Sequence, residues 1–136
     1  GYTLRKIHRC EDAIKCFDIA LSVNPGFLYA LNDRGYCLNE LGRYAEALNC
    51  FDRSLSLSPR NIRVIASKGI ALRELHRLEE SLECFNRALE LNAVNAFVYY
   101  QKSLTLREMG RVREADECLK RINFPWPGKT SHAPLS

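Results

Sequence analysis

Apolar residues recur at helical spacing between positions 31 and 41. Leu31, Gly35, Leu38 and Leu41 follow one another by four, three and three residues, which places them on one face of a helix. Gly42 comes next, and glycine tolerates the left-handed backbone that often ends a helix. The pattern therefore predicts a helix that stops at Gly42.

A second amphipathic helix is predicted between this stop and Pro59. Glu46 stands near its start, where the positive end of the helix dipole favours an acid. Pro59 then ends the unit, because proline cannot continue a helix. The apolar face of this helix consists of Ala47, Leu48, Phe51, Leu55 and Leu57. Together the two segments predict a pair of helices joined by a tight turn.

The same pair of helices recurs along the chain. Phe17, Phe51 and Phe85 follow at a constant step of 34 residues, and Leu119 takes the next slot. An internal repeat this regular predicts a stack of similar two-helix units. The register also holds at three other positions, occupied by Gly1, Gly35, Gly69 and Ser103, by Ala13, Ala47, Ser81 and Ala115, and by Pro25, Pro59 and Ala93.

This unit resembles the tetratricopeptide repeat, whose pattern W-x2-L-G-x2-Y…A-x3-F…P has a period of about 34 residues. The Ala-x3-Phe step appears as Ala13 to Phe17 and as Ala47 to Phe51. The resemblance implies an all-α fold, a right-handed α-solenoid of antiparallel helix pairs. It departs from the pattern where Leu31, Ile65 and Tyr99 replace the bulky Trp. It divides the chain into a truncated repeat (1–27), three repeats (28–61, 62–95 and 96–122) and a Pro-rich tail (123–136) that we expect to be extended or disordered.

The turns and ends of the stack give further expectations. His8 and His76 occupy the slot that Gly42 holds in the second unit, and His tolerates a left-handed backbone better than most residues. A helix is therefore predicted to end at each of these positions. Because Gly1 falls in the middle of the first helix of its unit, about half of that helix would lie upstream. We expect both ends to expose apolar surface that a parent protein covers or that drives self-association.

The resemblance also places a candidate binding site. In this family the first helix of each pair lines the concave side of the superhelix, and aromatic and Arg side chains in one concavity suit an extended peptide. We therefore expect a non-catalytic scaffold that binds a peptide or a segment of another protein. The candidate groove residues are Tyr29, Asn32, Asp33, Tyr36, Arg63, Ser67, Ile70, Arg73, Phe97, Tyr100, Gln101 and Arg107.

Other functions are weighed against this one. The repeats could be purely structural, dimerising or extending a longer array, and some of the aromatic residues would then simply pack between repeats. RNA binding is suggested by the net charge of +4, but interspersed acids argue against a nucleic-acid partner. The chaperone-tail ligand of some family members is also disfavoured, because the groove slots lack their Lys/Asn/Arg clamp and Asp33 would repel a carboxylate.

Two other residue types recur with the repeat. Arg34, Lys68 and Lys102 stand where the family often has Leu, so we expect their stems to lie along apolar surface while their charges reach solvent. Neighbouring repeats place equivalent residues about 8–10 Å apart, which is too far for a disulfide and does not converge on a metal. The recurring cysteines are therefore interpreted as packing residues: Cys16, Cys50, Cys84 and Cys118.

Composition narrows the class of protein. With 46% hydrophobic and 26% charged residues the chain reads as globular, and its uncharged runs are too short to span a membrane. None of the three histidines has a paired acid or nucleophile in a catalytic arrangement, so no catalytic, cofactor or metal site is predicted. The absence of a C-x-x-C pair favours reduced cysteines, so we expect an intracellular, cytoplasmic location.

The tail carries one separate hypothesis. Phe124 and Trp126 are large apolar residues in an otherwise polar segment. They could fold back over the last helix, or insert into the groove of a neighbouring molecule and so promote self-association.

Overall fold

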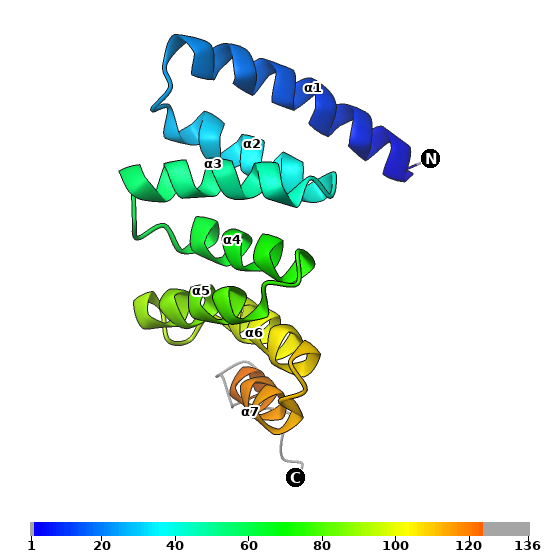
Figure 1. Cartoon of the computed structure of the whole chain (residues 1–136), viewed down its shortest axis with the longest axis vertical. Helices are drawn as coiled ribbons and strands as arrows, with labels where there is room; N and C mark the ends of the chain where they lie inside the picture. Colours follow the sequence, from blue (N-terminus) through cyan, green and yellow to red (C-terminus); the bar gives the residue numbers. More distant parts are fainter. Residues whose placement is uncertain (1, 124–136) are drawn as a thin grey trace, which may run out of the picture.

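The computed structural model describes residues 2–123, with side chains from 4 to 122, as seven α-helices without a strand. The helices are stacked along the long axis of the molecule, with α1 at one end and α7 at the other (Figure 1). Their bounds are α1 (Tyr2–Val23), α2 (Leu28–Glu40), α3 (Tyr44–Leu57), α4 (Ile62–Glu74), α5 (Leu78–Leu91), α6 (Ala96–Glu108) and α7 (Val112–Asn123).

Helices that are adjacent in the chain pack against each other throughout the stack. The pairs α2–α3, α4–α5 and α6–α7 share the most extensive contacts, and α3–α4 and α5–α6 join one pair to the next. The first helices of the pairs also touch, α2 with α4 and α4 with α6. The predicted all-α stack of helix pairs is confirmed. No helix among the described residues is long and apolar enough to cross a membrane.

In the units 28–61 and 62–95 the core is built on a phenylalanine that lies against a glycine. Phe51 and Phe85 are completely buried. The ring of Phe51 packs on Gly35 and the ring of Phe85 packs on Gly69, with no space for a Cβ atom at either glycine. The small residue of the repeat is therefore explained by this close approach of a ring to the helix backbone.

The turns between paired helices have a common construction. Gly42, His76 and Gly110 all have a left-handed backbone, with φ of 78°, 63° and 81°. The predicted left-handed turn at His76 is thus present. The arginine after each turn donates its backbone N–H to a leucine carbonyl oxygen at the end of the preceding helix: Arg43 to Leu38, Arg77 to Leu72 and Arg111 to Leu106.

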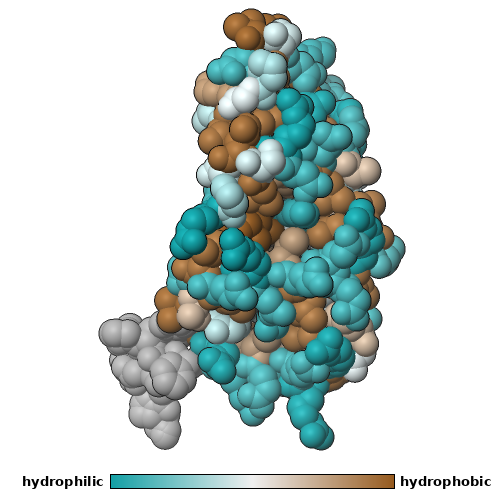
Figure 2. All heavy atoms as spheres, turned by 60° about the vertical axis from the view of Figure 1, so that its left-hand side comes forward, coloured by the Kyte–Doolittle hydropathy of each residue, from teal (hydrophilic) through white to brown (hydrophobic). Residues whose placement is uncertain are grey.

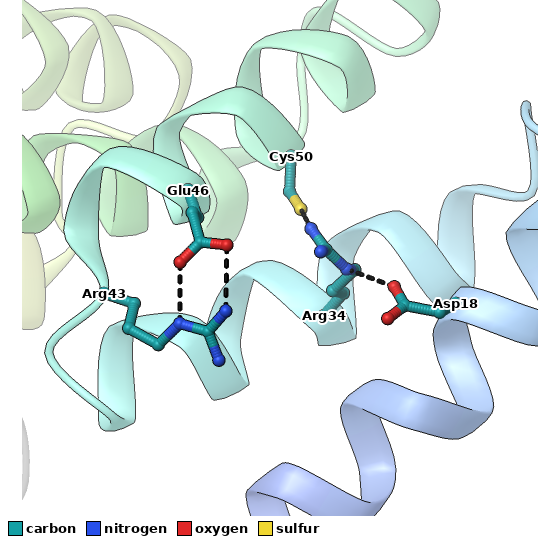
Figure 3. Close-up of polar contacts among 5 residues, drawn as sticks. All are labelled: Asp18, Arg34, Arg43, Glu46 and Cys50. Carbon is teal, nitrogen blue, oxygen red and sulfur yellow. Dashed lines mark hydrogen bonds and ion pairs between the residues drawn. The ribbon is translucent and has the colours of Figure 1, made fainter.

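Side chains of the same arginines close the turns. Each guanidinium makes two hydrogen bonds to a glutamate three residues later, and in every case one of the bonds is 2.6–2.7 Å long. The bonded guanidinium lowers the pKa of each glutamate below its usual value. Figure 3 shows the first of these pairs, which are Arg43–Glu46, Arg77–Glu80 and Arg111–Glu114.

The predicted turn at His8 is wrong, because α1 continues through it as a single helix of 22 residues. In the later units, burial of both paired helices offsets the cost of a left-handed residue. Before His8, by contrast, Leu4, Arg5 and Lys6 are exposed, and Ile7 is only partly buried. The unbroken helix keeps its backbone hydrogen bonds and loses little packing, so it is the favoured form.

The two ends of the stack differ. Ile19 and Val23 on α1 are exposed, as predicted for an end that lacks a neighbour. On α7 the apolar residues Ala115 and Cys118 are buried, whereas the exposed side chains are polar apart from Val112. The expectation of an apolar C-terminal end is met only in part among the described residues. Val112 is exposed and Leu119 and Ile122 are partly buried, whereas Ala115 and Cys118 are buried in the core. The hypothesis on Phe124 and Trp126 falls outside the described residues.

Candidate partner-binding groove

The first helices of the pairs enclose a groove of about 610 Å³. It runs across α2, α4 and α6, so one ligand would contact three repeats. The first turn of α3 and the residue before α6 complete its rim. Its lining consists of Tyr36, Asn39, Glu40, Tyr44, Ile62, Arg63, Ala66, Ser67, Ile70, Glu74, Asn95, Phe97 and Val98.

Apolar side chains form much of the groove wall. Ala66 and Val98 are buried, and Ile62 and Ile70 are partly buried. Phe97 is different, because 54% of this large apolar residue is exposed. Figure 2 shows more generally, on one side of the stack, that hydrophobic surface lies in patches between hydrophilic residues. An exposed aromatic ring beside an apolar wall offers the kind of anchor that buries an aliphatic side chain of a partner.

A cation–π contact joins α2 to α4 inside the groove. The guanidinium carbon of Arg63 lies 4.1 Å from the centre of the Tyr36 ring. Stacking fixes the plane of the guanidinium while its N–H groups remain available at the edge. Burial raises the pKa of Tyr36, although the charge of Arg63 opposes this shift. Tyr36 therefore stays protonated at neutral pH and keeps a hydroxyl donor.

Polar groups gather near one end of the groove. Asn39 donates from Nδ2 to the carbonyl oxygen of Ser67 at 3.2 Å, while its buried Oδ1 has no hydrogen-bond partner in the described structure. Glu40 is paired with Lys6 at 2.8 Å and Glu74 with Arg73 at 3.8 Å. Two paired carboxylates and an amide thus border the apolar wall, and they can accept hydrogen bonds from a peptide backbone.

The structure brings five of the twelve predicted residues to the groove lining. Three come from α4, one from α2 and one from α6. They are Tyr36, Arg63, Ser67, Ile70 and Phe97.

Arg73 has a different role from the one that the sequence suggested. Only 7% of the residue is exposed, and its Nη1 donates to Gln101 at Oε1 (2.8 Å) and at the backbone oxygen (3.3 Å). Gln101 is itself buried. The two side chains therefore form an interior link between α4 and α6. Arg73 was expected in the groove, but it does not line the groove, because its Nη1 is bonded to Gln101 in the next repeat.

The remaining candidates do not line the groove. The hydroxyl of Ser54 donates to Asn32. The ring of Tyr29 packs edge-to-face with Phe17 and tilted against Phe27, with ring centres 6.2 and 6.1 Å away. Arg107 forms an ion pair with Asp116 at 3.3 Å. Asp33 is partly buried and Tyr100 is exposed, and neither lines the groove.

Two lining residues were missed in the sequence because the family pattern assigns the groove to the first helices alone. Tyr44 begins α3, a second helix, and Asn95 precedes α6. Asn95 could have been found as a helix cap, since its Oδ1 accepts the backbone N–H of Val98 at 3.1 Å. Tyr44 follows the tight turn at Gly42, and only the packed turn brings it to the rim.

The basic residues between repeats do not simply reach solvent. Arg34 donates from Nε to Asp18 at 2.7 Å and from Nη1 to the Sγ of Cys50 at 3.0 Å (Figure 3). Lys68 forms an ion pair with Asp52 at 2.7 Å. Burial alone would lower the pKa of Lys68, but the bond to Asp52 reverses this, and the pKa is raised. Two of the three predicted snorkelling residues are instead ion-paired across a repeat boundary.

The cysteines follow the packing of the repeats. All six are free thiols. Cys50 and Cys118 are buried and Cys84 is partly buried, whereas Cys16 on the end helix α1 is exposed. Burial raises the pKa of Cys84 to about 11. Within the described part of the chain, no cluster of His, Cys, Asp and Glu residues could hold a metal ion.

Tetratricopeptide-repeat models match residues 28–61, 62–95 and 98–122. The chain therefore belongs to the tetratricopeptide repeat family. Proteins of this family are in general non-catalytic scaffolds for protein interactions, and membership supports that broad role here.

Solved structures of MamA share the fold. MamA AMB-1 superposes with a TM-score of 0.73 at 24% identity over 81% of this chain and 65% of that one. A structure titled crystal structure of MamA has a TM-score of 0.83 and 22% sequence identity, and the match covers 91% of this chain and 72% of that one. MamA from Desulfovibrio magneticus RS-1 has a TM-score of 0.82 and 19% sequence identity, and the match covers 88% of this chain and 67% of that one. The chain thus spans 65–72% of the length of these MamA chains. No curated protein sequence matches.

Proposed function

We propose that this chain is a non-catalytic scaffold that binds an extended peptide or protein segment in the groove across α2, α4 and α6. The observation that carries the proposal is the juxtaposition of exposed Phe97 with the stacked Arg63–Tyr36 pair along one groove of about 610 Å³. A volume of this size takes a few side chains of a ligand rather than a whole domain.

The chemistry of the groove indicates how such a segment would be held. Apolar ligand side chains would pack on Phe97, Ile70 and Val98, because these residues supply aromatic and aliphatic surface. The edge of the Arg63 guanidinium would bond ligand carbonyl or carboxylate oxygens. Glu74 and the Tyr36 hydroxyl would bond donors of the ligand.

A peptide-display selection tests the proposal. A random peptide library would be panned on the protein, and the dissociation constant of the selected peptide would be measured by fluorescence anisotropy. Phe97→Ala and Arg63→Gln should each weaken binding about tenfold or more. Leu57→Ala is the matched control, because Leu57 is as exposed as Phe97 but lies outside the groove. Equal affinities in all four proteins would contradict the proposal.

Self-association is the second candidate, and the exposed apolar side chains at the α1 end favour it. Ile19 and Val23 lie on α1, and Phe27 and Tyr29 follow beside it. Exposed apolar side chains gathered at one end of a molecule commonly mark a protein contact. Sedimentation equilibrium distinguishes the two roles: a monomer at all concentrations would dismiss self-association and leave groove binding unaffected.

A further inference from the structure

Ion pairs of one kind link the first repeat to the second and the second repeat to the third. The carboxylate comes from a second helix, and the basic residue comes from the following first helix. Asp18 on α1 pairs with Arg34 on α2, and Asp52 on α3 pairs with Lys68 on α4, both at 2.7 Å (Figure 3 shows the first pair). The next members of the two series are Asn86 on α5 and Lys102 on α6.

Asn86 stands where the two preceding repeats have an aspartate, and this interrupts the series. Asn86 carries no charge, and no carboxylate of the described structure forms an ion pair with Lys102. Lys102 is nevertheless partly buried, as Arg34 and Lys68 are. A partly buried lysine without a paired carboxylate can form an ion pair with an anionic partner.

Lys102 lines a cleft of about 440 Å³ between α5 and α7, floored by α6. We call this the α5–α7 cleft. Leu89, Tyr99, Leu106 and Cys118 give it apolar surface. Its other lining residues are Asn86, Glu90, Lys102, Glu114, Glu117 and Arg121.

The acids of the cleft already have cationic partners. Glu90 pairs with Arg87 at 3.6 Å, Glu114 with Arg111 at 2.7 Å, and Glu117 with Lys120 at 3.7 Å. Lys102 and Arg121 have no such pair in the described structure. The charge of Lys102 acts on Glu114 nearby and helps to lower the pKa of that carboxyl, but less than the hydrogen bond from Arg111 does. The α5–α7 cleft therefore combines an apolar wall with two cationic side chains that form no ion pair in the described structure.

The preceding repeats contain an equivalent cleft that serves as an internal comparison. It lies between α3 and α5, has a volume of about 240 Å³, and is lined by Leu55, Ile65, Lys68, Leu72 and Cys84 among others. These residues stand one repeat before Leu89, Tyr99, Lys102, Leu106 and Cys118. In this cleft the ammonium of Lys68 is neutralised by Asp52 from the chain itself.

We propose that the α5–α7 cleft is a second docking site, which takes an acidic side chain from an extended segment of a partner protein. The partner carboxylate pairs with Lys102 in the place that Asp52 occupies beside Lys68. An apolar residue next to it in the partner packs on Tyr99 and Leu89. Residues 124–136 contain no Asp or Glu, so this part of the chain has no acidic side chain to offer the cleft.

The site is separate from the groove across α2, α4 and α6. The lining of the groove and that of the α5–α7 cleft have no residue in common. A substitution that abolishes binding at one site therefore leaves binding at the other site measurable.

Nuclear magnetic resonance with short blocked peptides tests the proposal. The probe is acetyl-Leu-Asp-Leu-amide, with acetyl-Leu-Asn-Leu-amide as the neutral arm and acetyl-Leu-Leu-Leu with a free carboxylate as the C-terminal arm. The Asp peptide should shift the side-chain resonances of Lys102 and Tyr99, and the neutral peptide should bind about tenfold more weakly or worse.

Two substitutions exchange the charge between the equivalent clefts. Asn86→Asp should supply the missing carboxylate and weaken the binding of the Asp peptide about tenfold or more. Asp52→Asn should remove the carboxylate beside Lys68 and create a new binding site for the Asp peptide there. Asn49→Asp is the control for net charge, because Asn49 is exposed on α3 and lines neither cleft. Circular dichroism melts check that each variant folds.

Three results would overturn the proposal. They are equal binding of the neutral peptide, unchanged affinity in Asn86→Asp, and shifts confined to residues outside the cleft. Tighter binding of the C-terminal arm than of the Asp peptide would overturn the assignment of the carboxylate to a side chain.

Discussion

Gly69 lies so close to the ring of Phe85 that a Cβ atom on Gly69 would stand 2.7 Å from Cε1 of the phenylalanine. Carbon atoms do not approach to this distance without displacement. The same relation holds between Gly35 and Phe51 one repeat earlier. The glycine of the repeat is therefore required by the ring that packs on it, and not by its own backbone conformation.

Gly69→Ala should consequently lower the free energy of unfolding by about 1–3 kcal/mol, because the extra methyl group overpacks a buried contact. Gly26→Ala is the matched control, since its Cβ would have only ordinary contacts at 3.8 Å. Urea denaturation followed by circular dichroism measures both. Equal stabilities of the two variants would show that the ring contact does not set the requirement.

The turn at His76 offers a stabilising substitution. A left-handed backbone costs an L-residue about 1–2 kcal/mol, and His76 has φ of 63°. His76→Gly should therefore raise the free energy of unfolding by about 1 kcal/mol. Gly42→Ala makes the opposite change at the equivalent turn and should destabilise. A fall in stability for His76→Gly would mean that the imidazole makes a contact worth more than the strain.

The three arginine–glutamate pairs predict a contribution to acid sensitivity. Glu46, Glu80 and Glu114 have pKa values lowered mainly by hydrogen bonds from their arginines. Their stabilisation is present above the usual pKa of 4.5 and is lost as pH falls through the lowered values. Replacing all three with Gln should flatten the loss of stability below pH 4.5. The pairs are exposed, so the change should be small, and an unchanged acid profile would assign the sensitivity to other carboxylates.

The rate at which each cysteine reacts with a thiol reagent should follow the exposure of its side chain. Cys16 is exposed, whereas Cys50 is 1% exposed. Burial raises the pKa of Cys84 to about 11 and that of Cys37 to about 12, so both remain thiols near neutral pH. Iodoacetamide at pH 8 should therefore modify Cys16 first, as mapped by mass spectrometry. Rapid modification of Cys50 in the folded protein would contradict the buried slot, and denatured protein serves as the control.

The sequence was sufficient for features that depend on the repeat itself. The spacing of Gly35 and Phe51 predicted a helix pair, and His76 was recognised as a turn from its slot. His8 occupies the same slot and yet lies inside α1, because the cost of a turn is offset only where both helices are packed. Equivalent positions of the repeat therefore adopt the same backbone conformation only where the helices on both sides are packed in the same way.

Side-chain partners were harder to predict, because they depend on distances between repeats. Arg73 and Arg107 are equivalent in sequence, but Arg73 is buried against Gln101 while Arg107 is exposed and pairs with Asp116. The pairing of Asp52 with Lys68 likewise joins residues that only the stacking of helices brings together. A groove residue such as Tyr44 was missed for the same reason.

Mapping the display-selected peptide by methyl nuclear magnetic resonance tests the central claim most directly. The expected result is that the peptide shifts the methyl resonances of Ile62, Ile70 and Val98, which line the groove. The methyl groups of Ile19 and Val23 at the α1 end should stay unchanged and serve as internal references. Shifts at Ile19 and Val23 without shifts at Ile70 and Val98 would contradict binding in the groove.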